Sequence, residues 1–102
     1  MPEKRDILIV GGYGEVGRRI ASLMERNHAG SVLVAGRNPD RAPAVRSRRI
    51  DVDDPASIDA ALVGVGTIVA CVRQREPHLL RAAIRHGLAY TSIAPPWIDW
   101  PE

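Results

Sequence analysis

The chain has 102 residues, which is enough for one domain with one hydrophobic core. Its formal net charge is only +2 and its arginines are scattered along the sequence, which argues against a nucleic-acid-binding surface. A single cysteine excludes an internal disulfide, and no apolar run reaches membrane-spanning length, so we expect a cytoplasmic protein without membrane contact.

The first unit of the chain combines a strand over residues 6–10, a glycine-rich turn and a helix over 15–27. The glycines fit both G-x-G-x-x-G and G-x-x-G-x-x-G, the fingerprint of dinucleotide binding. Glycine permits a positive φ and a close approach to a pyrophosphate, which the free N–H groups of the following helix then face. We therefore predict a cofactor site at Gly11, Gly12, Tyr13, Gly14, Glu15, Val16 and Gly17. The alternative is a glycine turn with a purely structural role.

Short apolar strands and helices alternate along the rest of the chain. We expect strands over residues 31–36, 48–52, 67–72 and 88–93, and helices over 55–62 and 77–86. Between residues 41 and 47, Pro43 leaves room for one or two helical turns at most. This alternation predicts an α/β fold with a doubly wound parallel (Rossmann) sheet of about five strands in the order 3-2-1-4-5. The ligand crevice of such a sheet lies between strands 1 and 4.

The residues after the second predicted strand indicate which cofactor is bound. Arg37 stands where an NAD site places an acidic residue, about twenty positions beyond the last fingerprint glycine. A guanidinium there can bind a 2′-phosphate through two hydrogen bonds. We expect Gly36 and Arg37, with Asn38 as a donor and Arg41 as a second clamp, to favour NADP over NAD. Alternatively, Arg37 is an ordinary surface residue.

Three further residues are expected to line the crevice. Asp51 can accept a hydrogen bond from the adenine amino group, with the backbone of Val52 beside it. Asp51 can equally belong to a helix-capping group with Asp53 and Asp54. Cys71 follows the fourth predicted strand and should line the far wall, as an inert core thiol rather than a nucleophile.

The sequence shows no catalytic or metal-binding motif. Lys4 is the only lysine, so neither Tyr13 nor Tyr90 has a lysine four residues further on to lower the pKa of its phenol. The chain also lacks Gly-x-Ser-x-Gly, His-Glu-x-x-His and a Walker lysine. We therefore predict a cofactor site without catalytic residues.

Four segments of the chain resemble the N-terminal part of saccharopine dehydrogenase-like proteins. They are residues 7–17, 34–38, 51–54 and 82–90. The resemblance implies that residues 1–94 form the Rossmann domain of an NAD(P)-dependent oxidoreductase acting on C–N bonds or related substrates. The chain departs from the family at Thr91-Ser92, where an acid often occurs, and in lacking the substrate domain. No catalytic residue is transferred, so we expect cofactor binding without turnover.

The tail over residues 95–102 carries Trp97 and Trp100 among prolines. It is expected to lead toward the substrate domain or to form an apolar patch that pairs with a second copy; a disordered end is the competing interpretation. Two other functions stay open for the whole chain. One is a nucleotide-sensing module without enzymatic activity, and the other is an interaction domain that binds no nucleotide.

Overall fold

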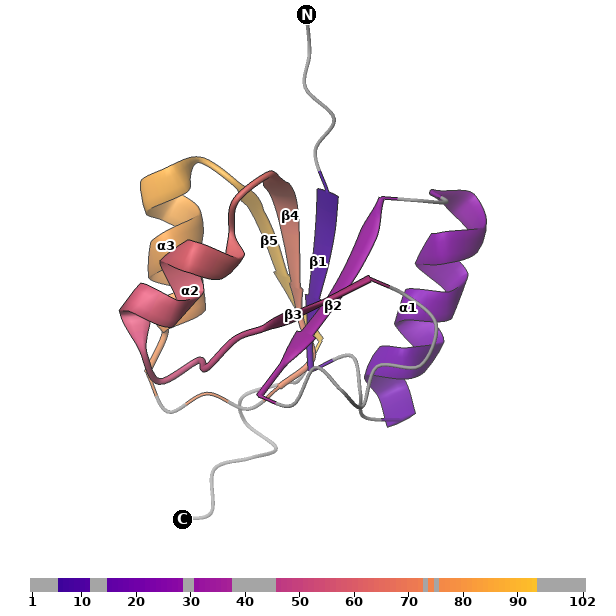
Figure 1. Cartoon of the computed structure of the whole chain (residues 1–102), viewed down its shortest axis with the longest axis horizontal. Coiled ribbons are helices and arrows are strands. Elements are labelled where there is room, and N and C mark those ends of the chain that lie inside the picture. Colours follow the sequence, from indigo (N-terminus) through magenta and orange to yellow (C-terminus); the bar gives the residue numbers. More distant parts are fainter. Residues whose placement is uncertain are drawn as a thin grey trace, which may run out of the picture.

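The structure of the chain is a computed structural model. It describes residues 6–11, 15–28, 31–37, 46–72, 74 and 76–93. The described strands form one parallel sheet in the order β3-β2-β1-β4-β5, which confirms the predicted fold (Figure 1). The strands are β1 (Asp6–Val10), β2 (Val32–Gly36), β3 (Arg46–Arg49), β4 (Val65–Ala70) and β5 (Ala89–Ser92). The helices are α1 (Glu15–Asn27), α2 (Pro55–Ala61) and α3 (His78–His86).

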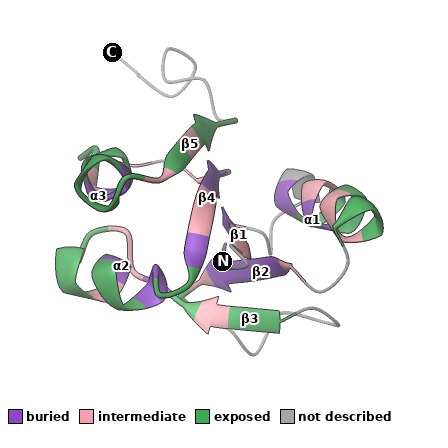
Figure 2. Ribbon diagram, turned by 90° about the horizontal axis from the view of Figure 1, so that it is seen from above, coloured by how far each residue is buried: buried purple, intermediate pink, exposed green. Residues whose placement is uncertain are grey.

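The sheet is covered on both faces, by α1 on one side and by α2 and α3 on the other (Figure 2). Successive side chains of a strand point to opposite faces, so β1 contributes to two core clusters. Leu8 and Val10 pack with residues of α2 and α3, whereas Ile9 packs with Ala21 of α1. This double burial explains why the strands at the centre of the sheet are almost entirely apolar.

The third strand lies earlier in the chain than predicted. Residues 48–52 were expected because Ile50 and Val52 are apolar, but β3 spans Arg46–Arg49. Ile50 still donates its N–H to the carbonyl of Gly36, at 2.9 Å. Asp51 then begins a turn, since its carbonyl accepts from the N–H of Asp54 at 3.0 Å. The apolar residues therefore follow the strand instead of forming it.

Arginine side chains secure β3 at the edge of the sheet. Arg46 reaches across β2 to Asp6, with 3.2 Å between nitrogen and carboxylate oxygen. Arg48 donates to the carbonyls of Ala61 and Val63, at 2.7 Å each, where α2 ends. Hydrogen bonds thus replace apolar burial on this strand, which is why hydrophobic periodicity did not reveal it.

The fourth strand also begins earlier than expected. Gly64-Val65-Gly66 looks like a turn in the sequence, yet only Gly64 has a positive φ, of 80°. Val65 is buried and pairs with Asp6, and Thr67 pairs with Ile7. Gly66 is left between the two pairs, so it occupies a β-bulge, a position that glycine tolerates well.

The adjacent residues Leu79 and Leu80 allow a matched test of the core. Leu79 is fully buried, whereas Leu80 is 41% exposed on the same helix. We expect Leu79→Ala to lower the free energy of unfolding by about 2–5 kcal/mol because it leaves a cavity. Leu80→Ala should lower it by only about 0.5 kcal/mol. Urea denaturation measures both values, and equal losses would contradict the packing described here.

A carboxylate joins α2 to α3 at the surface. Asp59 Oδ1 accepts hydrogen bonds from His86 Nε2 at 3.0 Å and from Arg85 Nη2 at 2.8 Å. These bonds, first that from His86 and then that from Arg85, hold the pKa of Asp59 below its ordinary value of 3.8. Because the folded state lowers this pKa, the contact stabilises the fold above pH 3.8 and is lost as the pH falls through the lowered value.

We expect His86→Ala to raise the pKa of Asp59 toward its ordinary value, because the variant removes the main hydrogen bond. NMR titration of the Asp59 carboxyl resonance measures the change. His78→Ala removes a histidine from the other end of the same helix and should leave the resonance unchanged. A shift of the same size in both variants would show that the effect is not local.

Candidate functional site

The carboxyl ends of the strands meet at one edge of the sheet, the lower edge in Figure 1. β1 lies between β2 and β4, and both neighbours pair with it in parallel. The helix after β1 covers one face, whereas the helices flanking β4 cover the other. The strand order therefore reverses between β1 and β4, which is where ligands of open α/β sheets bind.

Gly11 occupies this point of reversal. Its φ of +85° strongly favours glycine, and its N–H donates to the carbonyl of Ala35 at 2.8 Å. A Cβ at this position would lie 3.0 Å from the carbonyl oxygen of Cys71. The residue after β1 thus lies against the backbone after β4, and a side chain at this position would make a tight contact that forces its neighbours to shift by a few tenths of an ångström. The structure fits the close backbone approach that a dinucleotide-binding turn needs.

The remaining fingerprint residues divide into two groups. Gly17 is buried in α1, as expected for a glycine that lets the helix lie close to the sheet. Glu15 and Val16 begin the same helix. The predicted site residues Gly12, Tyr13, Gly14, Asn38 and Arg41 lie outside the described residues.

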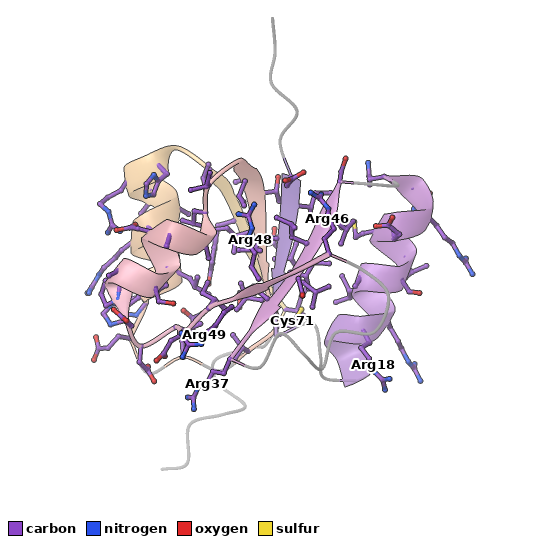
Figure 3. All side chains as sticks on the ribbon, in the orientation of Figure 1. Arg18, Arg37, Arg46, Arg48, Arg49 and Cys71 are labelled. Carbon is purple, nitrogen blue, oxygen red and sulfur yellow. The ribbon has the colours of Figure 1, made fainter. Side chains whose placement is uncertain are left out.

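Arg37 directly follows β2 at the same edge of the sheet (Figure 3). Its side chain is 70% exposed, and its Nη2 lies 4.0 Å from Asp53 Oδ2, which is itself on a side chain 56% exposed. An exposed ion pair of this length contributes little to stability. The guanidinium is therefore accessible to an anionic ligand that offers better hydrogen-bond geometry.

Asp51 shapes the turn that follows β3. Its Oδ1 accepts from the N–H of Asp53 at 3.0 Å, and its own N–H donates to the hydroxyl of Ser57 at 2.9 Å. The side chain that caps α2 belongs to Asp54, which accepts from the N–H of Ala56 at 3.1 Å. The predicted contact of Asp51 with adenine stays a prediction.

Val52 and Cys71 lie on opposite sides of the site, after β3 and after β4. Val52 is partly buried and packs against the core beneath α2 and α3, whereas Cys71 packs on the side of α1. Burial raises the pKa of the Cys71 thiol. A raised pKa keeps the thiol protonated at neutral pH, which suits a packing residue better than a nucleophile.

Sequence reasoning missed a polar pair between β4 and β5. Gln74, in the loop after β4, donates from Nε2 to the hydroxyl of Tyr90, at 3.1 Å. Its Oε1 is buried and has no hydrogen-bond partner among the residues that the structure describes. The two residues are separated by sixteen positions and approach only because their strands are neighbours. No local sequence signal would have joined them.

The described residues show neither a metal-binding cluster nor a membrane-spanning helix. Within these ranges, histidine, cysteine, aspartate and glutamate nowhere gather in a group of three that could hold a metal ion. None of the helices defined in this part of the chain has the length and apolar character needed to cross a membrane.

The chain matches a known protein family and shares its fold with solved structures. The family described as the saccharopine dehydrogenase NADP binding domain matches residues 7–96. A search of curated proteins gives no match. Saccharopine dehydrogenase (L-Glu forming) from Saccharomyces cerevisiae is 21% identical with a TM-score of 0.76, over 93% of this chain and 23% of that protein.

Two other solved structures share the fold. L-threonine dehydrogenase from Phytophthora infestans is 20% identical with a TM-score of 0.73, over 85% of this chain and 35% of that protein. An NADPH-dependent quinone oxidoreductase from Escherichia coli is 25% identical with a TM-score of 0.67, over 82% of this chain and 34% of that protein. The chain thus spans 23% to 35% of the lengths of these three proteins.

Substitution of Gly11 by alanine tests the contact between β1 and β4. Gly11→Ala should lower the free energy of unfolding by more than about 2 kcal/mol, because it combines backbone strain with a clash. Gly87→Ala is the matched control, since Gly87 has a φ of +70° but its Cβ would meet nothing within 4 Å. Strain alone should cost about 1 kcal/mol there. Thermal and urea unfolding measure both, and a Gly11 variant as stable as the control would contradict the predicted clash.

Proposed function

We propose that this chain, which belongs to the family of saccharopine dehydrogenase NADP-binding domains, binds NADP(H) at the carboxyl edge of its sheet. The observation that carries the proposal is Arg37, an exposed guanidinium at the end of β2. It stands beside the point where the strand order reverses, at the position that decides between NADP and NAD.

The pyrophosphate of the cofactor is assigned to the glycine turn. Gly11 places the backbone after β1 against the backbone after β4, and α1 begins shortly after it, at Glu15. The first N–H groups of a helix have no partners within it, and they lie at the positive end of its dipole. Gly11, Gly12, Gly14 and Gly17, with Tyr13, Glu15 and Val16, therefore form the proposed phosphate-binding segment.

The adenosine half is assigned to the ends of β2 and β3. Arg37 pairs with the 2′-phosphate, and Gly36, Asn38 and Arg41 complete this part of the proposed site. NAD carries a hydroxyl in place of the 2′-phosphate and gains less from the guanidinium. Asp51 and Val52 lie beyond β3 beside the adenine, and Cys71 forms the opposite wall after β4.

The whole protein is proposed to be an NADP-dependent oxidoreductase in which this domain holds the cofactor. NADP(H), when bound, accepts or donates a hydride. The residues of this chain bind and orient the cofactor, and a substrate domain is proposed to supply the remaining groups. Two of the related structures are dehydrogenases, and the third is named as NADPH-dependent, which supports this assignment.

Calorimetric titration with NADPH and NADH, each on its own, tests the proposal. The chain should bind NADPH more tightly, and Arg37→Ala should weaken NADPH binding by about tenfold or more because a charge-assisted pair is lost. NADH binding should change by less than about twofold. Arg26→Ala, which removes an exposed arginine from the last turn of α1, is the control for net charge.

The other outcomes separate the competing functions. Tighter binding of NADH would overturn the role of Arg37 but keep the dinucleotide site. A folded protein that binds neither cofactor would contradict the proposal and favour a purely structural glycine turn. Cofactor-dependent dimerisation in the same samples, followed by sedimentation, would favour a nucleotide-sensing module instead.

A further inference from the structure

A second arginine lies beside Arg37 at the carboxyl edge of the sheet. β3 pairs with β2 in parallel, and Arg49 is in register with Gly36, the residue immediately before Arg37. The ladder continues one step beyond this pair, because Ile50 donates its N–H to the carbonyl of Gly36 at 2.9 Å. Figure 3 shows Arg37 and Arg49 at the same end of the sheet.

The register also fixes the face from which Arg49 projects. Partners in a parallel ladder point to the same side of the sheet, and alternate residues of a strand share a face. Val34 and Gly36 pair with Ser47 and Arg49, and Val34 belongs to the core cluster formed with α1. Arg49 therefore projects on the α1 side. Gly36 has no side chain, so it leaves the position next to Arg49 open.

Arg49 differs from the two other arginines of β3 in its partners. Arg46 pairs with Asp6, and Arg48 donates to two carbonyls at the end of α2. Arg49 is exposed, and the residues that the structure describes offer its side chain no hydrogen bond or ion pair. A hydrogen-bonding role within the fold explains Arg46 and Arg48 but does not explain Arg49.

The two arginines share this edge of the sheet with the carboxylates of Asp51, Asp53 and Asp54, of which Asp51 and Asp54 accept hydrogen bonds from backbone N–H groups. Arg37 and Arg49 bring two exposed guanidiniums to this edge, and Asp53 is the carboxylate found near Arg37, at 4.0 Å. Arginine side chains are long enough to reach toward a common ligand from neighbouring strand ends, and an anion between two guanidiniums is attracted by both. A phosphate monoester carries nearly two negative charges at neutral pH and has three acceptor oxygens, so it can pair with both.

We infer that Arg49 is a second specificity residue of the site, whose guanidinium binds the 2′-phosphate of NADP(H) together with Arg37. This inference rests on the proposed function. It makes the choice between NADP and NAD depend on two neighbouring strands, β2 and β3, instead of on one loop. Gly36, which precedes Arg37 in the chain and pairs with Arg49, provides the flat surface on which the phosphate-bearing ribose lies.

The experiment compares two fragments of the cofactor, adenosine 2′,5′-bisphosphate and adenosine 5′-monophosphate, by calorimetry. Arg49→Ala should weaken binding of the bisphosphate by about tenfold and of the monophosphate by less than about twofold. Arg49→Lys should recover part of the loss, because it restores the charge but not the planar donor pair. The double variant of Arg37 and Arg49 to alanine should bind both nucleotides almost equally.

The controls keep this inference separate from the proposed function. If Arg37→Ala removes the preference for the bisphosphate and Arg49→Ala does not, the inference is wrong and the proposed function stands. If the unmodified protein shows no preference for NADPH or for the bisphosphate, the proposed function fails. Equal weakening of both nucleotides by Arg49→Ala would indicate general electrostatic attraction and would also overturn the inference. Arg26→Ala controls for net charge, and thermal melting confirms that each variant is folded.

Discussion

The contact between the end of β1 and the backbone after β4 is the constraint on which the site depends. Cys71 donates its N–H to the carbonyl of Val10, and Gly11 places its own backbone against the carbonyl of Cys71. The two strands are thereby held together at the point where the connections diverge to opposite faces. Every residue assigned to the cofactor is positioned relative to this contact, because β2 and β3 are built outward from β1.

The domain belongs to the family of saccharopine dehydrogenase NADP-binding domains. Its apolar residues lie in the packed strands, and its exposed polar residues follow the strand ends. The core positions of β1 and β2 are apolar and fully enclosed, so they set the backbone but contact no ligand. In the proposed function, recognition falls to the first residues beyond each strand, where side chains leave the packed interior. A rigid sheet thus supports short segments whose chemistry can change without altering the fold.

Sequence reasoning predicted the features that depend on apolar periodicity and on glycine. The strand order, the bounds of α1 and the end of α3 at His86 agree with the structure. It placed β3 and β4 too late in the chain, because Arg46 and Arg48 are secured by hydrogen bonds and Gly66 lies in a bulge. Arg49 could not be assigned beforehand, since its position beside Gly36 follows only from the register. The same holds for Gln74 and Tyr90, which become neighbours through the pairing of β4 with β5.

The central position of β1 has a consequence for how the chain reaches its folded state. β1 can pair early with β2, but its other partner, β4, is synthesised roughly sixty residues after β1. Until that strand arrives, one side of β1 exposes its backbone N–H and C=O groups, and Leu8 and Val10 lack the apolar neighbours that β4, α2 and α3 supply. The first element of the chain is therefore among the last to be completed, and folding on the ribosome must wait for the second half of the domain.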